Sequence, residues 1–411
     1  MPDDSPSPTK PISIGIVGLG GRGRSVLART LAIDPHVRVP AVCDYRKDRA
    51  AAGAAMVKNL RGNTPEIYDE DEHHYLKMLE RDDLDAVLVT TDIYWTGRIA
   101  IDSLRAGKHA GHEVPGCYSL QECRELVEAH EETGRHCMLL ENCCYSRETM
   151  TLYNMIRKGL LGEPYFATGS YIHEVRNMFL EGNGSLTWRG KLWAEDYGCS
   201  YNSHAIGTPS KWLGINDGDR FAYCACSMTS PREAHLYAVE KFGKDSPAAQ
   251  IEFKTGDFVT TLIETAKGKQ IRIDYSLASE RPYSRYYLVQ GMNGCYDSRT
   301  GIYVEGQGPN ETWRKLEEFM EEWEHPFWKY DGDKARQVGG HGGYDYFCER
   351  EFIKMVRTGD PPWIDAYDSA AWSSILEVSH QSIDAGGARV EVPDFTNGKW
   401  RDEKWRIDRM V

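Results

Sequence analysis

Residues 12–23 read ISIGIVGLGGRG, and this stretch decides the fold. Apolar residues fill its first half, which predicts a buried strand. Gly18, Gly20 and Gly23 follow with the spacing G-x-G-x-x-G. The first glycine permits a tight turn, the second lets a pyrophosphate approach the backbone, and the third lets helix and strand pack closely. The stretch therefore predicts a dinucleotide-binding edge, at which the helix N-terminus offers unpaired N–H groups to the phosphates.

A second apolar run, residues 37–43, ends at Asp44. An acidic residue about 20 positions after the glycines is expected to bind the ribose 2′-hydroxyl of the dinucleotide. Its carboxylate would repel a 2′-phosphate, which favours NAD, whereas the neighbouring Arg46 and Lys47 leave NADP open. Gly21 and Arg22 are expected at the phosphate turn.

The first third of the chain alternates strand-like and helix-like segments. This rhythm predicts a doubly wound parallel sheet with helices on both faces, a Rossmann domain over residues 11–145. The expected strands are 12–17, 37–43, 86–90, 109–111 and 136–140, and the expected helices are 24–32, 48–58, 72–80, 96–106 and 120–133.

The pattern changes near residue 145, where strand-like segments begin to dominate. Residues 146–411 are expected to form an α+β domain with a large, open, predominantly antiparallel sheet. Helices within residues 344–384 would brace the two domains. The Gly- and Trp-rich segment 177–202 is expected to be a long loop that either covers substrate or is anchored by surface tryptophans. The other expected elements are a helix over 147–158 and strands over 165–173, 221–228, 248–253, 257–265, 269–277, 286–291 and 294–297.

Composition restricts the possible partners and compartment. The chain has 411 residues, a formal charge of −13 and no basic stripe, which argues against nucleic-acid binding. No apolar run is long enough to span a membrane. Residues 1–10 are polar and proline-rich, which is typical of a disordered tail rather than a secretory signal. The 11 cysteines contain no C-x-x-C pair and indicate reduced thiols in a cytoplasmic protein, with export of a longer precursor left open.

Several motifs together resemble the Gfo/Idh/MocA family of NAD(P)-dependent oxidoreductases. Beside the glycine stretch, residues 107–115 read GKHAGHEVP. Most of that family has Glu-Lys-Pro here, with a lysine that takes part in dehydrogenation, but this chain has Val114. The family's Asp-x-x-x-His signature is incomplete as well, because Ser200 stands at the acidic position before His204.

These departures indicate a particular branch. The stretches HCMLLENCCYSRETM (136–150), GSYIHEVR (169–176) and RPYSR (281–285) resemble glycoside hydrolase family 109. The resemblance implies an NAD-dependent glycosidase that hydrolyses an α-glycoside, with an N-acetylgalactosaminide as the first choice. In the implied reaction, transient oxidation at sugar C3 permits elimination across C1–C2, water addition and hydride return. This route is an exception to the two-carboxylate scheme. The resemblance also implies a homo-oligomer, a dimer or tetramer.

Such chemistry needs groups that exchange protons near neutral pH, for which His and Tyr are suited. Tyr171 and His173 occupy alternate positions of a predicted strand and therefore share one face. We expect His204 to take the C3 hydroxyl proton. Tyr171 and His173, with Tyr201 beside them, are candidates for the C2 proton and the leaving group, in an order that the sequence leaves open.

The resemblance also assigns binding residues by position. Arg189 and Tyr283, together with Tyr201 and His204, would contact the sugar. The nicotinamide end of the cofactor would contact Glu113, Val114 and Asn142. Trp95 either packs against the cofactor or belongs to the core.

Two alternative functions remain at this stage: a sugar or cyclitol dehydrogenase, and a non-catalytic sugar-binding protein that keeps NAD as a structural ligand. The first predicts stoichiometric NADH release. A bound metal is not expected, because the nearest histidine cluster, His73, His74, His109 and His112, lacks a convincing ligand set.

Overall fold

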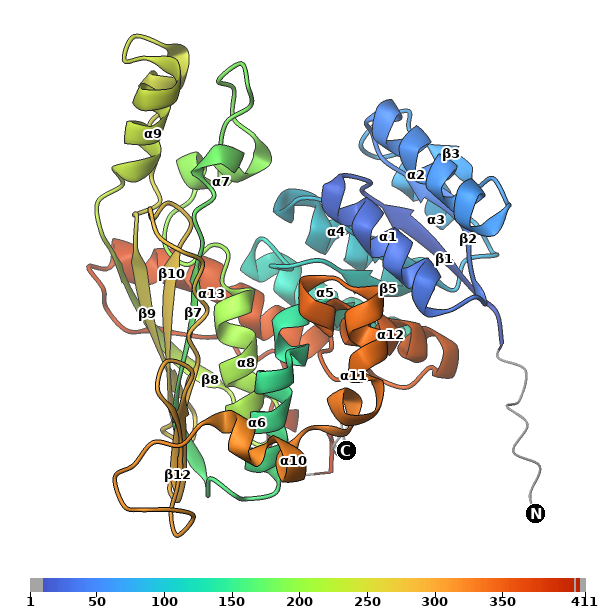
Figure 1. Cartoon of the computed structure of the whole chain (residues 1–411). Helices are drawn as coiled ribbons and strands as arrows, with labels where there is room; N and C mark the ends of the chain where they lie inside the picture. Colours follow the sequence, from blue (N-terminus) through green and yellow to red (C-terminus); the bar gives the residue numbers. More distant parts are fainter. Residues whose placement is uncertain (1–9, 403, 407–411) are drawn as a thin grey trace, which may run out of the picture.

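The computed structural model describes residues 10–402 and 404–406. The chain builds two sheets, each with helices packed against it, and Figure 1 shows them side by side. The predicted tail over residues 1–10 lies, apart from Lys10, outside the described residues. Among the helices that are described, none is both long enough and apolar enough to cross a bilayer.

The first sheet has the predicted Rossmann architecture. Its strands run in the order β3-β2-β1-β4-β5-β6, and every neighbouring pair is parallel. The order changes direction between β1 and β4, and the carboxyl ends of strands at such a point form the usual ligand crevice. The strands are β1 (Ile12–Val17), β2 (Val37–Cys43), β3 (Glu66–Tyr68), β4 (Ala86–Val89), β5 (His109–His112) and β6 (Cys137–Leu139). The helices between them are α1 (Gly21–Ile33), α2 (Lys47–Arg61), α3 (Tyr75–Leu79), α4 (Ile93–Arg105) and α5 (Leu120–Thr133).

The second sheet is predominantly antiparallel, as the sequence predicts. Its eight strands have the order β13-β12-β11-β7-β10-β9-β8-β14, and β7 and β10 form its parallel pair. The strands are β7 (Pro164–Ile172), β8 (Phe221–Met228), β9 (Val259–Thr265), β10 (Gln270–Ser276), β11 (Leu288–Gly291), β12 (Gly294–Asp297), β13 (Gly301–Val304) and β14 (Val390–Glu391).

Helices cover one face of this second sheet. The helix α8 (Ser203–Leu213) packs on β7 and β10, and α13 (Ala366–Asp384) packs on both β8 and α5. The helix α12 (Tyr344–Thr358) lies against α1 and against the short 3₁₀ helix η1 (Asn142–Tyr145). The remaining helices of four or more residues are α6 (Arg147–Arg157), α7 (Trp188–Glu195), α9 (Glu233–Phe242), η3 (Pro247–Gln250), η4 (Leu316–Phe319), α10 (Met320–Trp323) and α11 (Pro326–Val338).

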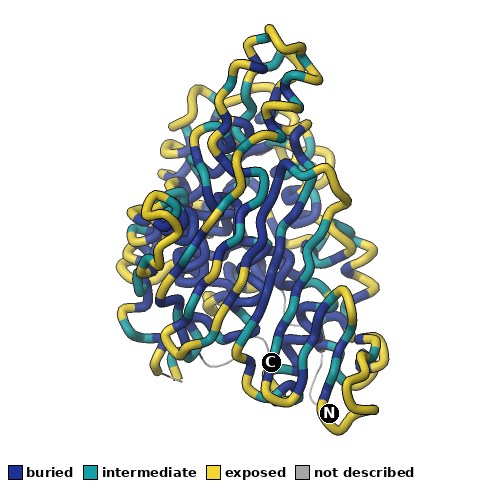
Figure 2. The backbone as a smooth tube through the Cα atoms, turned by 90° about the vertical axis from the view of Figure 1, so that its left-hand side faces the viewer, coloured by how far each residue is buried: buried dark blue, intermediate teal, exposed yellow. Residues whose placement is uncertain are grey.

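The opposite face of the sheet is open. Tyr223 on β8 and Leu262 on β9 are exposed there. Figure 2 shows exposed and partly buried stretches interspersed with buried ones along these strands. The alternation follows from the two-residue period of a strand, which turns successive side chains to opposite faces.

Two predictions are wrong, the strand over 248–253 and the long loop over 177–202. The segment 248–253 is not a strand, because Ser246 caps the 3₁₀ helix η3, whose first residue is Pro247. Proline fits the first turn of a helix and lacks the N–H that a strand would use. The segment 177–202 is not irregular throughout, since it contains α7, capped by the Thr187 side chain.

Candidate active site

The glycine edge has the geometry that its sequence predicts. Gly18 has φ +91°, and a Cβ there would lie 2.7 Å from the backbone of Thr90. A Cβ on Gly23 would lie 2.0 Å from the carbonyl oxygen of Gly18. In contrast, a Cβ on Gly21 would meet nothing within 4 Å. Two glycines are therefore required by the fold itself, whereas Gly21 leaves bare backbone facing open space at the start of α1.

Asp44 lies directly after β2 and holds this turn in place. Its carboxylate accepts hydrogen bonds from the backbone N–H groups of Leu19, at 2.7 Å, and Arg46, at 2.9 Å. The side chain is buried but lines the cavity beside the glycines. This position suits a contact with ribose hydroxyls and leaves little room for a second negative charge.

A cavity of about 430 Å³ runs along this edge. Its lining includes every predicted cofactor residue except Asn142: Gly18, Gly20, Gly21, Arg22, Gly23, Asp44, Trp95, Glu113 and Val114. The segment between β7 and α8 supplies another wall, with Leu186, Trp188, Arg189 and Tyr201. The bare backbone at Gly21, the helix N-terminus and the buried carboxylate fit a dinucleotide at this place.

Arg22, beside the predicted phosphate turn, forms ion pairs with two carboxylates. Its Nε donates to Glu113 at 2.6 Å, and its Nη1 donates to Asp345 at 2.8 Å. Burial lowers the pKa of Arg22, but the two carboxylates more than offset this and keep it charged. Arg22 thus ties α1 to β5 and α12, and its charge is largely matched before any phosphate binds.

Asn142 lies outside the cavity lining. Its side-chain amide donates to Asp345 and lies 3.3 Å from Nδ1 of His341. Asn142 therefore belongs to the polar contact between η1 and α12, next to the ion pair of Arg22.

The predicted sugar-side residues come together around Tyr171. Its ring centroid lies 4.7 Å from that of His204, 5.8 Å from Tyr201 and 5.9 Å from Tyr283. Its hydroxyl lies 3.2 Å from Nδ1 of His173. Three separate segments of the chain, around residues 171–173, 201–204 and 283, therefore meet in one cluster of aromatic and imidazole rings.

One close approach explains why His204 reaches Tyr171. A Cβ on Gly169 of β7 would lie 1.8 Å from the carbonyl oxygen of Ala205. Glycine at this position lets the first turn of α8 rest directly on the strand. His204, the second residue of α8, is thereby held over Tyr171, two residues further along β7.

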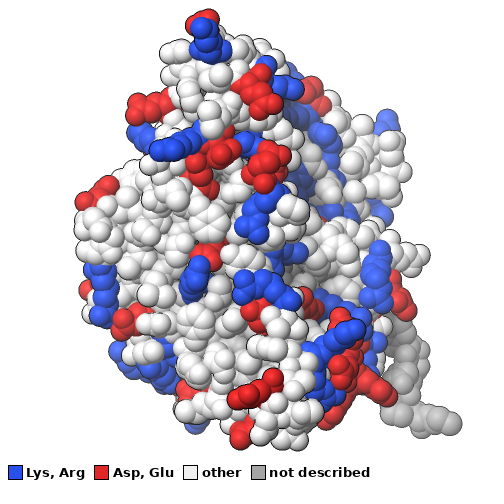
Figure 3. Space-filling view, turned by 60° about the vertical axis from the view of Figure 1, so that its left-hand side comes forward, with Lys and Arg blue, Asp and Glu red and all other residues white. Residues whose placement is uncertain are grey.

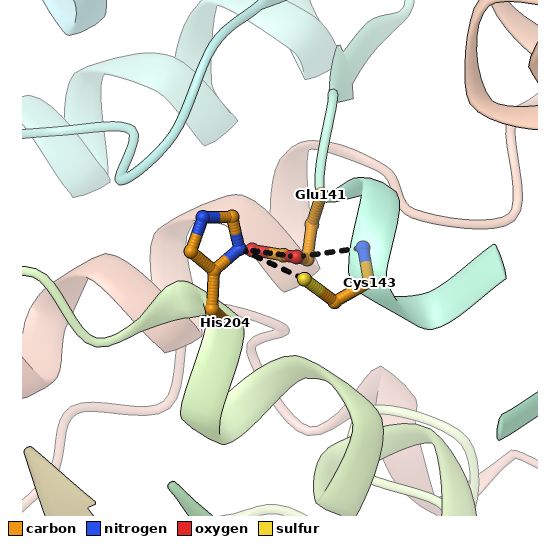
Figure 4. Close-up of side chains that lie close together, drawn as sticks. All are labelled: Glu141, Cys143 and His204. Atoms are coloured by element: carbon orange, nitrogen blue, oxygen red, sulfur yellow. Dashed lines mark hydrogen bonds and ion pairs between the residues drawn. The ribbon is translucent and has the colours of Figure 1, made fainter. Parts of the chain in front are cut away.

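Three residues without an assigned role in the sequence also belong to the site. Nδ1 of His204 lies 2.8 Å from Oε1 of Glu141 and 3.2 Å from Sγ of Cys143 (Figure 4). Nη1 of Arg285 donates to the same Sγ at 2.5 Å. These residues lie in the stretches ENCCY and RPYSR, so the motifs marked the right segments without revealing the contacts.

Burial sets the protonation of these groups. It raises the pKa of Tyr171 far above its ordinary value and also raises that of Tyr201, so both phenols stay protonated. Burial lowers the pKa of His173, and the charge of His204 lowers it further. Burial would also lower the pKa of His204, but Cys143 and Glu141 raise it well above its ordinary value. The cluster thus combines proton donors with a neutral imidazole.

Arg189 lies at the border between cavity and cluster. Its guanidinium lies 4.2 Å from the centroid of the Trp188 ring, and both residues line the cavity. A guanidinium held on an aromatic face keeps its donors available for a carbonyl or carboxylate group.

Fold and cavity together define a class of protein, a nicotinamide-dependent enzyme with a Rossmann sheet and a second, largely antiparallel sheet. Residues 12–140 match the oxidoreductase family with an NAD-binding Rossmann fold, and residues 145–402 match the C-terminal domain of glycosyl hydrolase 109. The chain belongs to glycosyl hydrolase family 109, and it is an NAD-dependent glycoside hydrolase.

Relatives of nearly the same length support this assignment. A glycosyl hydrolase family 109 protein of Solibacter usitatus is 35% identical over 96% of this chain and 90% of its own length. An alpha-N-acetylgalactosaminidase of Shewanella oneidensis is 34% identical over 96% of this chain and 87% of its own length.

Solved structures share the fold at low sequence identity. Levoglucosan dehydrogenase in complex with NADH and L-sorbose has a TM-score of 0.70 at 17% identity, covering 94% of this chain and 100% of its own. A probable dehydrogenase from Thermotoga maritima has a TM-score of 0.64 at 17% identity, covering 92% and 98%. These likenesses concern the two-domain architecture alone.

Proposed function

We propose that the protein hydrolyses α-linked N-acetylgalactosaminides without net oxidation of the sugar. The main support is the position of Tyr201, which lines the dinucleotide cavity and stacks on Tyr171 in the side-chain cluster. A sugar bound against this cluster would therefore lie next to the nicotinamide end of the cofactor. The alpha-N-acetylgalactosaminidase from Shewanella oneidensis supports the choice of sugar.

Bound NAD supplies a reversible hydride acceptor for sugar C3. The protein's own part begins at His204, which is neutral above its raised pKa and in that form takes the proton of the C3 hydroxyl; it returns the proton to the same oxygen at the end of the turnover. A ketone at C3 acidifies the hydrogen at C2, because the resulting carbanion is delocalised as an enolate.

Two neighbouring residues then share the elimination and the addition of water. His173, kept neutral by burial, takes the C2 proton. The electron pair of the C2–H bond then forms the C1–C2 double bond as the C1–O bond breaks. Tyr171, whose phenol stays protonated, gives its proton to the leaving oxygen. The 3.2 Å contact between the two lets the proton on His173 pass to Tyr171. Addition of water reverses the proton transfers and leaves hydroxyl at C1.

Two further residues would hold the sugar. Arg189 would bind the acetamido carbonyl through its planar donors. Tyr283 packs edge-on against His173, with ring centroids 4.6 Å apart, and remains half exposed, which suits a stacking contact with the sugar ring.

A screen of nitrophenyl glycosides tests this function. The purified protein should release nitrophenol from the α-N-acetylgalactosaminide with no added nucleotide and no metal. Accumulation of NADH in proportion to product would instead identify a dehydrogenase. Sugar binding without any turnover, left unchanged by His204→Ala, would identify a non-catalytic protein.

We further propose that a second copy of the chain covers the open face of the second sheet. Tyr223 and Leu262 are exposed there, and Figure 3 shows a broad uncharged area between scattered acidic and basic side chains. Leu262→Asp should shift the mass measured by light scattering from a multiple of the subunit mass to that of the monomer. A wild-type protein with the monomer mass at micromolar concentration would refute this arrangement.

A further inference from the structure

The Glu141 carboxylate is an unusual group to find in this core. Its side chain is fully buried at the end of β6. Oε1 accepts from the backbone N–H of Cys143 at 3.0 Å and lies 2.8 Å from Nδ1 of His204. Oε2 is buried and has no hydrogen-bond partner among the residues that the structure describes. A buried carboxylate is costly unless a cation or strong donor compensates it, and the imidazole is the group in contact.

The contact also fixes the orientation of the imidazole. Glu141 and Cys143 both lie at Nδ1, which carries a single proton for the two acceptors to share. When that proton is on Nδ1, the lone pair of a neutral imidazole is on Nε2. Figure 4 shows the second ring nitrogen pointing away from Glu141 and Cys143. The backbone carbonyl of His204 is held as well, since it accepts from the hydroxyl of Tyr287 at 2.6 Å.

The surrounding charges leave Glu141 as the carboxylate in direct contact with this ring. Arg285, from the segment before β11, donates to Cys143 rather than to Glu141. Sγ of Cys143 also donates to Oδ1 of Asn142 at 3.4 Å. The groups that interact with His204, Glu141 or Cys143 from the other elements are Tyr171, His173, Tyr201, Tyr283, Tyr287 and Tyr344.

We propose that Glu141, assisted by Cys143, is the positioning residue that orients His204 and makes it a base at Nε2. The inference rests on the proposed function, because it concerns the residue assigned to the C3 hydroxyl. Glu141 does not reach the sugar in this arrangement and acts through His204. The carboxylate comes from the end of β6 rather than from α8 or the residues just before it, where Ser200 stands.

The isosteric variant Glu141→Gln tests the proposal, because it keeps the side-chain oxygen and removes the charge. We expect kcat to fall by about 100-fold or more with KM little changed. Without the carboxylate, the His204 imidazolium is less stable, so the acid limb of the kcat–pH profile should move to lower pH by about one unit or more. Cys143→Ser keeps an acceptor and should lower kcat by about 10-fold or less, with a smaller shift in the same direction.

Glu349→Gln is the matched control, since Glu349 is another buried carboxylate, held by Arg29 at 2.7 Å. We expect it to lower the melting temperature without moving the acid limb. The proposal is overturned if the Glu141→Gln enzyme loses activity while its acid limb stays in place, or if it keeps full activity. If Glu141→Gln does not fold, the acid limb of Cys143→Ser is measured instead, and a limb that stays in place overturns the proposal.

A second readout needs no turnover and therefore separates this inference from the proposed function. The ring nitrogens of His204 can be titrated by NMR in the resting protein, with His204→Asn used to assign the signal. The midpoint should fall in Glu141→Gln even if the protein cleaves no glycoside. An unchanged midpoint would overturn the pairing, whereas a lowered midpoint without glycosidase activity would count against the proposed function alone.

Discussion

The two walls of the site are built in opposite ways. The nucleotide wall comes from one short stretch, Gly18–Gly23, and one acid after the next strand, and it works chiefly through bare backbone. The proposed sugar wall, formed by Tyr171, His173, Tyr201, His204 and Tyr283, comes from segments that are far apart in the sequence and would work through side chains. Adding a methyl group should therefore damage the first wall, and removing functional atoms should damage the second.

The variant His204→Ala is expected to give the largest difference between its effect on catalysis and its effect on nucleotide binding. We expect kcat to fall by roughly 1000-fold, because the base for the C3 hydroxyl is lost. The amount of nucleotide bound to the purified protein should stay the same, since His204 is not part of the cavity lining. His235→Ala, at an exposed position of α9, is the matched control and should leave both quantities unchanged. Loss of nucleotide from His204→Ala would mean that the walls are not independent.

A pair of glycine variants distinguishes the glycine that the fold requires from the glycine that leaves room for the nucleotide. Gly23→Ala would place a methyl group 2.0 Å from the Gly18 carbonyl oxygen, so α1 must move away from β1. We expect a loss of about 1–3 kcal/mol in stability and little bound nucleotide. Gly21→Ala meets no protein atom within 4 Å and should leave the melting temperature of the nucleotide-free protein unchanged while weakening NAD binding. Equal melting temperatures for the two variants would contradict this division.

Asp44→Ala tests the side chain on which the nucleotide wall depends. The variant loses the acceptor for the backbone N–H groups of Leu19 and Arg46, together with the expected ribose contact. Affinity for NAD should fall by about 10- to 100-fold, measured by calorimetry on nucleotide-free protein. The preference for NAD over NADP should also shrink, because Arg46 and Arg49 line the same cavity. An unchanged preference would show that another group rejects the 2′-phosphate.

The smallest effect concerns His112, the last residue of β5, which packs against Ser369 of α13. It is fully buried, and burial lowers its pKa to about 4. Nδ1 lies 3.1 Å from the carbonyl oxygen of Glu113 and Nε2 lies 3.0 Å from Oγ of Ser369, which satisfies a neutral ring. Because the unfolded chain binds this proton more readily, stability should fall as pH decreases from about 6.5 to 4. Burial lowers the pKa of His109 to about 4 as well, with the same sign.

Urea unfolding at several pH values measures this effect. His112→Asn, whose amide can replace the Nδ1 donor, should reduce the slope of unfolding free energy against pH without removing the part due to His109. A slope that stays the same in the variant would contradict the assignment to His112.

The contrast between the walls also explains what could be predicted. The glycine edge and Asp44 were predictable because strand, turn and helix follow one another and their spacing reports the geometry directly. Tyr171 and His173 were predictable as a pair, since alternate residues of a strand share a face. The helix α8 was not predicted, because Gly207 and Pro209 interrupt its helical pattern and its position depends on contact with Gly169.

Contacts across long distances in the sequence account for the rest. Glu141, Cys143 and Arg285 meet His204 only after β6, α8 and the second sheet have been brought together. No spacing within one segment encodes these contacts. Arg22 illustrates the same point, since its position at the phosphate turn follows from the motif, but its ion pairs with Glu113 and Asp345 do not.

In the proposed mechanism, the sugar loses and regains its C2 hydrogen while it is bound between a nicotinamide and the Tyr171–His173 pair. Hydrolysis of the α-N-acetylgalactosaminide in D₂O, with mass and NMR analysis of the released sugar, tests it most directly. The account predicts one solvent deuterium at C2 in the product and none at C3. Release of a sugar that keeps its original hydrogen at C2 would contradict it.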